Sequence, residues 1–267
     1  MMLLINSCQK KLSHNFPTAI KSLLEQLLNH TSGLANYLTP EFYAETRKNP
    51  TRNWIAPEAI KYAYNLPPVG TPGQRFEYAD TNYILLELIV EKVTNFTLTK
   101  EIRSRILTPL NMKDTFMEVQ ETIPGGFANG YRKVNGSRTN VTQLDEGNGL
   151  GDGGLISTSA DLAKFIHGLL AEAKLLSPES LKQMLTFFKN DNYGLGIASN
   201  KTGWGQLLGH NGVMTGFRAE MHYLPNRDVT VIVLGNNEDQ DISGLVEKAL
   251  DVLLSEPPQW LKRLFKN

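Results

Sequence analysis

Residues 217–234 read Phe-Arg-Ala-Glu-Met-His-Tyr-Leu-Pro-Asn-Arg-Asp-Val-Thr-Val-Ile-Val-Leu, and they indicate the fold class more clearly than any other segment. Apolar and polar residues alternate from Phe217 to Tyr223, which is typical of a strand with one buried face. The run Pro225-Asn226-Arg227-Asp228 predicts a turn, and residues 229–234 form a second, continuously apolar strand. Because so short a turn joins the two strands, they should pair in antiparallel fashion.

Helical patterns precede and follow these strands. Residues 81–94 are apolar apart from a narrow stripe of Glu87 and Glu91, so we expect this helix to be mostly buried. Helices first and an antiparallel sheet last predict an α+β fold built in layers. The other segments with helical spacing or a helix-start signal are 18–29, 97–110, 158–170, 177–189 and 241–254.

The composition excludes several classes of protein. The chain has 267 residues, 41% of them hydrophobic and 20% charged, which argues against wholesale disorder. Its 27 Lys and Arg residues balance 27 Asp and Glu residues, so no overall field attracts nucleic acid or anionic lipid. Cys8 is the only cysteine, and no His or Cys pair has zinc-site spacing. We therefore expect no metal, no cofactor and no nucleic-acid partner.

Neither end of the chain predicts insertion into a membrane. The apolar run Met1–Ile5 is shorter than the roughly 7–15 residues of a signal peptide and has no basic flank. As written, the chain is therefore expected in the cytoplasm. The tail Trp260-Leu261-Lys262-Arg263-Leu264-Phe265-Lys266 could touch a membrane surface, but so short a segment fits packing or fraying better.

Several separate stretches share the order and spacing of a known superfamily. They are Leu27-Leu28-Asn29-His30-Thr31-Ser32-Gly33-Leu34; Pro72-Gly73 with Phe76-Glu77-Tyr78-Ala79-Asp80-Thr81-Asn82-Tyr83; Pro109-Leu110-Asn111-Met112; Gly153-Gly154-Leu155-Ile156-Ser157-Thr158; and His210-Asn211-Gly212 with Gly216-Phe217 and Tyr223-Leu224-Pro225. Together they resemble the serine beta-lactamase/penicillin-binding-protein superfamily, in its branch of class C beta-lactamases, D-alanyl-D-alanine carboxypeptidases and related esterases.

The resemblance implies one domain over residues 1–267 with a beta-lactamase/transpeptidase-like fold, in which helices flank an antiparallel sheet beside a mainly helical region. We expect the mainly helical region at 17–200 and the strands with the last helix at 201–267. Residues 1–16 then form an N-terminal stub unlike the family. Members of the family are usually exported, unlike the expectation for this chain as written.

The family's second motif is Tyr-x-Asn, and its counterpart here is Tyr78-Ala79-Asp80. Tyr78 then resembles the catalytic Tyr, with a half-buried turn aromatic as the alternative. Asp80 stands where Asn is commoner and is expected to bind substrate. It could also cap the helix that starts at Thr81, and both roles can hold at once. A Tyr serves as a base near neutral pH only beside a cation that stabilises its phenolate.

The third motif is Lys-Thr-Gly or His-x-Gly on an edge strand, and its counterpart by context is His210-Asn211-Gly212. His210 is then catalytic, while Asn211 and Gly212 bind substrate, because Gly lets the substrate backbone approach. The alternative for His210 is a structural histidine. The rival triplet Lys201-Thr202-Gly203 lacks the Gly-Phe and Leu-Pro that follow in the family, so we expect it in a solvated loop. In the family, the His30 and Ser32 motif supports the fold.

The first motif, Ser-x-x-Lys, has no convincing counterpart. Its only match is Ser7-Cys8-Gln9-Lys10, and chance alone predicts about one match in a chain of this composition. Pro17 would end any helix begun at Ser7, although the family's nucleophile opens a long buried helix. Ser7 and Lys10 are therefore weak candidates. The resemblance then implies that the first strands and the nucleophile helix are missing, leaving a three-strand sheet with an exposed edge.

Two functions follow from the resemblance. In one, the chain is a serine hydrolase that transfers acyl groups from a beta-lactam, a D-Ala-D-Ala peptide or a small ester. In the other, it is a truncated, inactive homologue that binds at most a ligand or a partner. Without the Lys of the first motif, Tyr78 should stay protonated and act as a poor base. An exposed sheet edge would favour self-association.

Overall fold

The computed structural model describes residues 24–189 and 191–255, so the candidates Ser7 and Lys10 and the tail from Trp260 lie outside the described residues. The helix expected over 81–94 is observed with the same bounds, and the one expected over 177–189 ends at Met184. The helices are α2 Leu24–Leu28, α3 Pro40–Lys48, α4 Ala56–Ala59 with the 3-10 turn η2 Ile60–Ala63, α5 Thr81–Thr94, α6 Leu98–Ile102 with the π-helical η3 Arg103–Leu107, α7 Ser159–Leu170, α8 Pro178–Met184 and α9 Ser243–Leu254.

Four antiparallel strands form the main sheet in the order β5-β6-β7-β8. The predicted hairpin is β7 with β8, which confirms the α+β class. The sheet nevertheless has four strands where three were expected, because β5 pairs with the first half of β6 and so places Lys201 in a strand. The strands are β1 Phe116–Met117 paired with β4 Leu155–Ile156, β2 Tyr131–Val134 paired with β3 Ser137–Asn140, β5 Ala198–Thr202, β6 Gly205–Met214, β7 Phe217–Leu224 and β8 Val229–Gly235.

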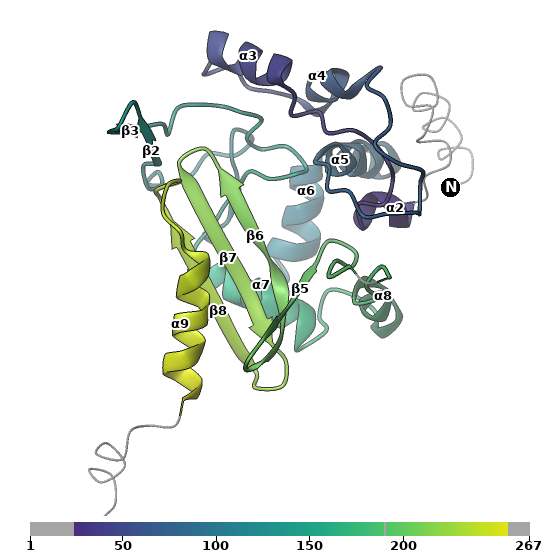
Figure 1. Ribbon diagram of the computed structural model, residues 1–267, viewed down its shortest axis with the longest axis vertical. Helices are drawn as coiled ribbons and strands as arrows, with labels where there is room; N and C mark the ends of the chain where they lie inside the picture. Colours follow the sequence, from purple (N-terminus) through teal and green to yellow (C-terminus); the bar gives the residue numbers. More distant parts are fainter. Residues whose placement is uncertain (1–23, 190, 256–267) are drawn as a thin grey trace, which may run out of the picture.

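Each face of the sheet meets a different helix, α9 on one side and α7 on the other (Figure 1). Leu224 and Val231 are buried against Val246 and Leu250 of α9. The alternate residues of β7 point the other way, where the Tyr223 ring contacts His167 of α7. The period-two pattern of β7 therefore separates two environments that are both partly buried, rather than a core from open solvent.

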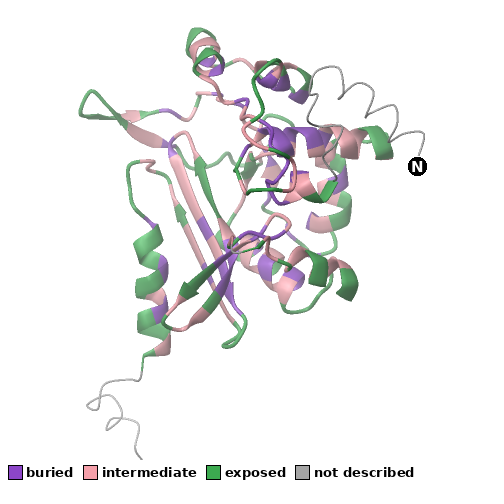
Figure 2. Ribbon diagram, turned by 45° about the vertical axis from the view of Figure 1, so that its right-hand side comes forward, coloured by how far each residue is buried: buried purple, intermediate pink, exposed green. Residues whose placement is uncertain are grey.

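The helical region has its own core around α5, and Figure 2 shows buried residues gathered there. Phe42 and Ile84 are fully buried in it, and the Trp54 indole packs on the Phe42 ring. Glu87 was expected on a polar stripe, yet it is only 5% exposed and its Oε2 accepts a hydrogen bond of 2.7 Å from the Gly151 N–H. The neighbouring loop supplies the partner that lets this carboxyl lie inside.

Over the ranges 24–189 and 191–255, no helix is both long enough and apolar enough to cross a bilayer.

Candidate functional site

A cavity of about 870 Å³ lies where the helical region meets the sheet. Tyr78, His210, Asn211 and Gly212 all line it, so the second and third predicted motifs meet there although more than 130 residues separate them. Asp80 is not among its lining residues. Apolar side chains form much of the remaining wall: Leu98, Ile102, Met117, Leu150, Ile156, Met214 and Leu234.

The second half of β6 presents a free backbone edge to this cavity. β5 pairs only with residues 205–209, so residues 210–214 lack a neighbour on that side within the described sheet. A Cβ added at Gly209 would lie 1.9 Å from the Met221 carbonyl oxygen, whereas one at Gly212 would meet only the Ala219 Cβ at 3.5 Å. Packing therefore demands a glycine at 209 and leaves open space at 212, beside the free edge.

Tyr78 reaches the cavity from the segment just before α5 and is 45% exposed. Its ring stacks on the imidazole of His30 with centroids 4.0 Å apart. Partial burial raises the pKa of the Tyr78 phenol above its usual value, and the negative charge of Asp80 adds to the shift. These directions agree with the expectation that Tyr78 stays protonated.

The neighbouring imidazole does not supply a cation. His30 is fully buried, and its Nδ1 accepts a 3.2 Å hydrogen bond from the Ala79 N–H while lying 3.1 Å from Asn82 Nδ2. Burial lowers the pKa of His30 to about 4, and the charge of His210 contributes. Ser32 donates its hydroxyl to Asn82 Oδ1 at 2.5 Å. This network joins the His30 turn to α5, which is the structural role expected from the resemblance.

His210 has contacts on both ring nitrogens. Its Nδ1 lies 2.6 Å from the Asn211 carbonyl oxygen, and its Nε2 lies 2.8 Å from the Tyr193 hydroxyl. Because a carbonyl only accepts, the proton sits on Nδ1 and Tyr193 donates to Nε2. Both nitrogens are thereby occupied. The sequence does not mark Tyr193 as a site residue, since its only local signal is an aromatic ring beside Gly194 and Gly196.

Asp80 does not cap α5, so that part of the prediction is wrong. Its backbone is already helical, at φ −61° and ψ −27°, and its side chain makes no cap hydrogen bond. An N-cap residue needs an extended backbone to reach back to the first free N–H groups. The Asp80 carboxylate instead accepts a 2.7 Å hydrogen bond from Asn36 Nδ2.

The other candidate groups lie elsewhere or are engaged. Lys201 is exposed on β5 and does not line the cavity. Among the described lining residues there is no Lys, and the one Ser is Ser157. Its hydroxyl lies 2.8 Å from that of Thr115. The described part of the chain therefore brings together the Tyr and His motifs without a Ser–Lys pair.

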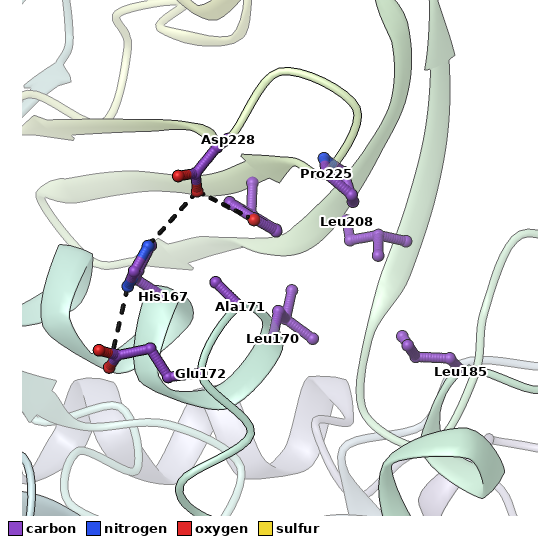
Figure 3. A pocket seen from close by; sticks show the side chains of 9 residues that line it. His167, Leu170, Ala171, Glu172, Leu185, Leu208, Pro225 and Asp228 are labelled. Atoms are coloured by element: carbon purple, nitrogen blue, oxygen red, sulfur yellow. Dashed lines mark hydrogen bonds and ion pairs between the residues drawn. The ribbon is translucent and has the colours of Figure 1, made fainter. Parts of the chain in front are cut away.

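A second hollow, of about 460 Å³, lies where α7 meets the turn between β7 and β8, and it contains none of the predicted site residues (Figure 3). His167 Nε2 lies 3.4 Å from Asp228 Oδ1, and its Nδ1 lies 3.9 Å from Glu172 Oε2. Tyr223 donates its hydroxyl to Asp228 at 3.0 Å. These contacts link the C-terminal end of α7 to the turn between β7 and β8.

Comparison with known proteins agrees with this geometry. The model of the Beta-lactamase family matches residues 16–254, and the chain therefore belongs to the Beta-lactamase family. Penicillin-binding protein 4* of Bacillus subtilis (strain 168) is 26% identical over 88% of this chain and 56% of its own length. Protein flp of Staphylococcus aureus (strain N315) is 29% identical over 84% of this chain and 45% of its own. The chain spans about half the length of these relatives.

Solved structures show the same fold. D-amino acid amidase from Ochrobactrum anthropi SV3, complexed with L-phenylalanine amide, aligns with a TM-score of 0.73 and 26% identity, over 91% of this chain and 74% of its own. The penicillin binding protein from Bacillus halodurans aligns with a TM-score of 0.76 and 24% identity, over 91% and 76% of the two chains. Its likeness concerns the fold alone. The chain is thus a homologue of beta-lactamase-family serine hydrolases.

Proposed function

We propose that this chain binds amide- or lactam-containing ligands of its family in the cavity beside β6, and that the described residues do not become acylated by them. The observation that carries the proposal is the convergence of Tyr78, His210 and the free edge of β6 on a cavity that no described Lys lines. The described residues therefore form a wall that can bind a ligand, but they bring no Ser–Lys pair to the cavity.

The free edge of β6 supports ligand binding through backbone groups. An extended amide can add to an exposed strand edge by main-chain hydrogen bonds, without displacing a side chain. At Gly212 the nearest atom to an added Cβ is 3.5 Å away, so a ligand backbone can approach the strand closely there. Asn211 is exposed beside it and offers both donor and acceptor atoms.

The groups that would transfer protons argue against acyl transfer by the described residues. Tyr78 has a raised pKa and stacks on a histidine that stays neutral, and no Lys among the described lining residues favours its phenolate. His210 has both nitrogens engaged. The remaining enzymatic hypothesis needs Ser7 to attack while Lys10 and Tyr78 relay protons.

Intact-mass measurement with a reactive penicillin, paired with calorimetry, tests the proposal on the full chain. We expect no covalent adduct, but saturable binding of a simple amide such as D-phenylalanine amide. Circular dichroism before and after the incubation establishes that the protein is folded. An adduct mapped to Ser7 would instead identify a serine hydrolase. Folded protein that binds neither compound would refute ligand binding in this cavity.

A further inference from the structure

Asp152 is a carboxylate in the cavity wall that has no cationic partner among the described residues. It lies in the glycine-rich loop before β4, lines the cavity and is partly buried. Its Oδ2 accepts a 2.8 Å hydrogen bond from the hydroxyl of Tyr37, which is almost fully buried. Within the described ranges, no Lys, Arg or His lies within ion-pair distance of this carboxylate. A buried carboxylate without a cation is costly when ionised.

The surroundings of Asp152 add negative charge. Burial raises the pKa of Asp152 to about 7, and the like charges of Asp80 and Glu87 contribute to the shift. Among the described residues that line the cavity, Arg218 is the sole Lys or Arg. It pairs in the sheet with Val213, three residues along β6 from His210, and its Nε donates to the Glu238 carbonyl. The cavity wall at Asp152 therefore favours a ligand that carries a positive charge.

We propose that Asp152 determines ligand specificity by binding the ammonium group of an α-amino amide or of a peptide with a free N-terminus. The proposal rests on the proposed function, since the ligand is the one that β6 would hold. An ammonium can take the remaining acceptor positions of Asp152 while Tyr37 keeps its own hydrogen bond. The resulting charge-assisted contact lies in a partly desolvated wall, where such contacts are strongest.

The layout of the cavity fits an amine close to an amide. Asp152 and Tyr78 both line the cavity, and the Tyr78 and His210 rings have centroids 6.4 Å apart. Asp152, Tyr78 and the start of the free β6 edge therefore all form part of the wall of one cavity. In an α-amino amide one carbon separates the ammonium from the amide, so the ammonium can contact Asp152 while the amide contacts the edge of β6.

The test compares D-phenylalanine amide with N-acetyl-D-phenylalanine amide, whose acetyl group removes the positive charge. Calorimetry on the full chain at pH 7 is suitable, because an α-amino group with a pKa of about 7.7–8.0 is then mostly protonated. We expect wild-type protein to bind the free amine at least tenfold more tightly, since hydrogen bonds to charged groups contribute on the order of tenfold to a hundredfold. Equal affinities would overturn the role of Asp152 and leave the proposed function standing, whereas no binding of either compound would refute the proposed function itself.

The Asp152→Asn variant tests the residue directly. Asparagine keeps the shape and an oxygen acceptor for Tyr37, so we expect the fold to persist and circular dichroism to be unchanged. The variant should lose the preference for the amine and bind the acetylated ligand within twofold of wild type. Asp114→Asn makes the same charge change at an exposed position outside the cavity and should retain the preference. An undiminished preference in Asp152→Asn would overturn the proposal, and the wild-type comparison decides the matter if that variant does not fold.

Discussion

Single residues in this protein owe their chemistry to neighbours that are distant in sequence. Burial raises the pKa of Glu87 to about 7, and only the hydrogen bond from the Gly151 N–H opposes the shift. His30 moves the other way, because burial penalises the charged form of either group. Near pH 6, His30 and Glu87 are therefore mostly charged in the unfolded chain and mostly neutral in the folded protein.

Glu87→Gln should stabilise the protein at high pH and have little effect at low pH. The folded pKa of about 7 exceeds the ordinary 4.5, so the contribution of Glu87 to wild-type stability is greatest below pH 4.5 and falls as the pH rises towards 7. Glutamine removes that loss while keeping an acceptor for Gly151. We expect a gain on the order of 2–3 kcal/mol at pH 8 and almost none at pH 4.5, measured by urea unfolding. The same gain at both pH values would contradict the burial argument.

His210→Ala and Lys201→Ala distinguish the two candidates for the third motif. His210 lines the cavity and is positioned by Tyr193, whereas Lys201 lies exposed on β5. We expect the first substitution to weaken binding of D-phenylalanine amide about tenfold and the second to change it less than twofold, by calorimetry. Equal losses would mean that the motif was assigned to the wrong strand.

At the scale of elements, β6 serves two purposes along its length. Its first half is a paired strand in which Gly209 allows the Met221 backbone of β7 to pass closely. Its second half is unpaired on one side and forms a cavity wall. The alternation of residues cannot reveal this change, because the length of β5, a different segment, sets where the pairing stops.

Gly212→Ala should separate binding from folding. The added methyl has room in the protein, and alanine costs less backbone entropy than glycine in a strand, so stability should fall by less than about 1 kcal/mol or rise slightly. The same methyl would project from the sheet face into the cavity, beside the Ala219 methyl, and take up space that a ligand needs, so we expect calorimetry to show at least tenfold weaker binding. Gly209→Ala is the control for packing, and its clash with Met221 should lower thermal stability markedly. Unchanged affinity in Gly212→Ala would mean that the ligand does not lie against this edge.

At the scale of the whole molecule, the sheet formed by the described residues ends in β8, which has no further strand beside it among them. β8 follows β7 as the last strand in the order, and its seven residues carry neither charge nor proline. Leu234 on it is 44% exposed. Natural proteins usually protect such edges with lysine, proline or a covering element. The expected self-association through an exposed edge therefore stays a prediction, now assigned to β8.

Thr230→Lys should weaken that association. The substitution would add a positive charge to the β8 strand of each copy, so two approaching β8 edges would repel each other, and lysine is a common protector of edge strands. We expect wild-type protein to show a concentration-dependent mass in light scattering and the variant to remain monomeric over the same range. Asn200→Lys, on β5 at the other end of the sheet, is the matched control and should behave as wild type. A wild-type mass that is monomeric at every concentration would end this prediction.

Local patterns were sufficient for the elements that depend on nearest neighbours in sequence. Periodicity and short turns, which act over a few residues, predict the span of α5, the helix α7 and the β7–β8 hairpin. The motif residues Tyr78 and His210 both line one cavity, and the roles expected for them stay predictions. The extra strand β5 was missed, because its polar residues gain strand structure only by pairing with β6.

The amino-acid sequence by itself determined the fold class, the family resemblance and the lack of a convincing counterpart of the Ser-x-x-Lys motif in the residues given. Only the tertiary structure decided that Asp80 bonds to Asn36, that Tyr193 holds His210, and that Asp152 faces the cavity beside Tyr37. The physical reason is distance along the chain: Tyr37 and Asp152 are 115 positions apart, so their contact, and the burial that raises the pKa of Asp152, arise only when the chain folds.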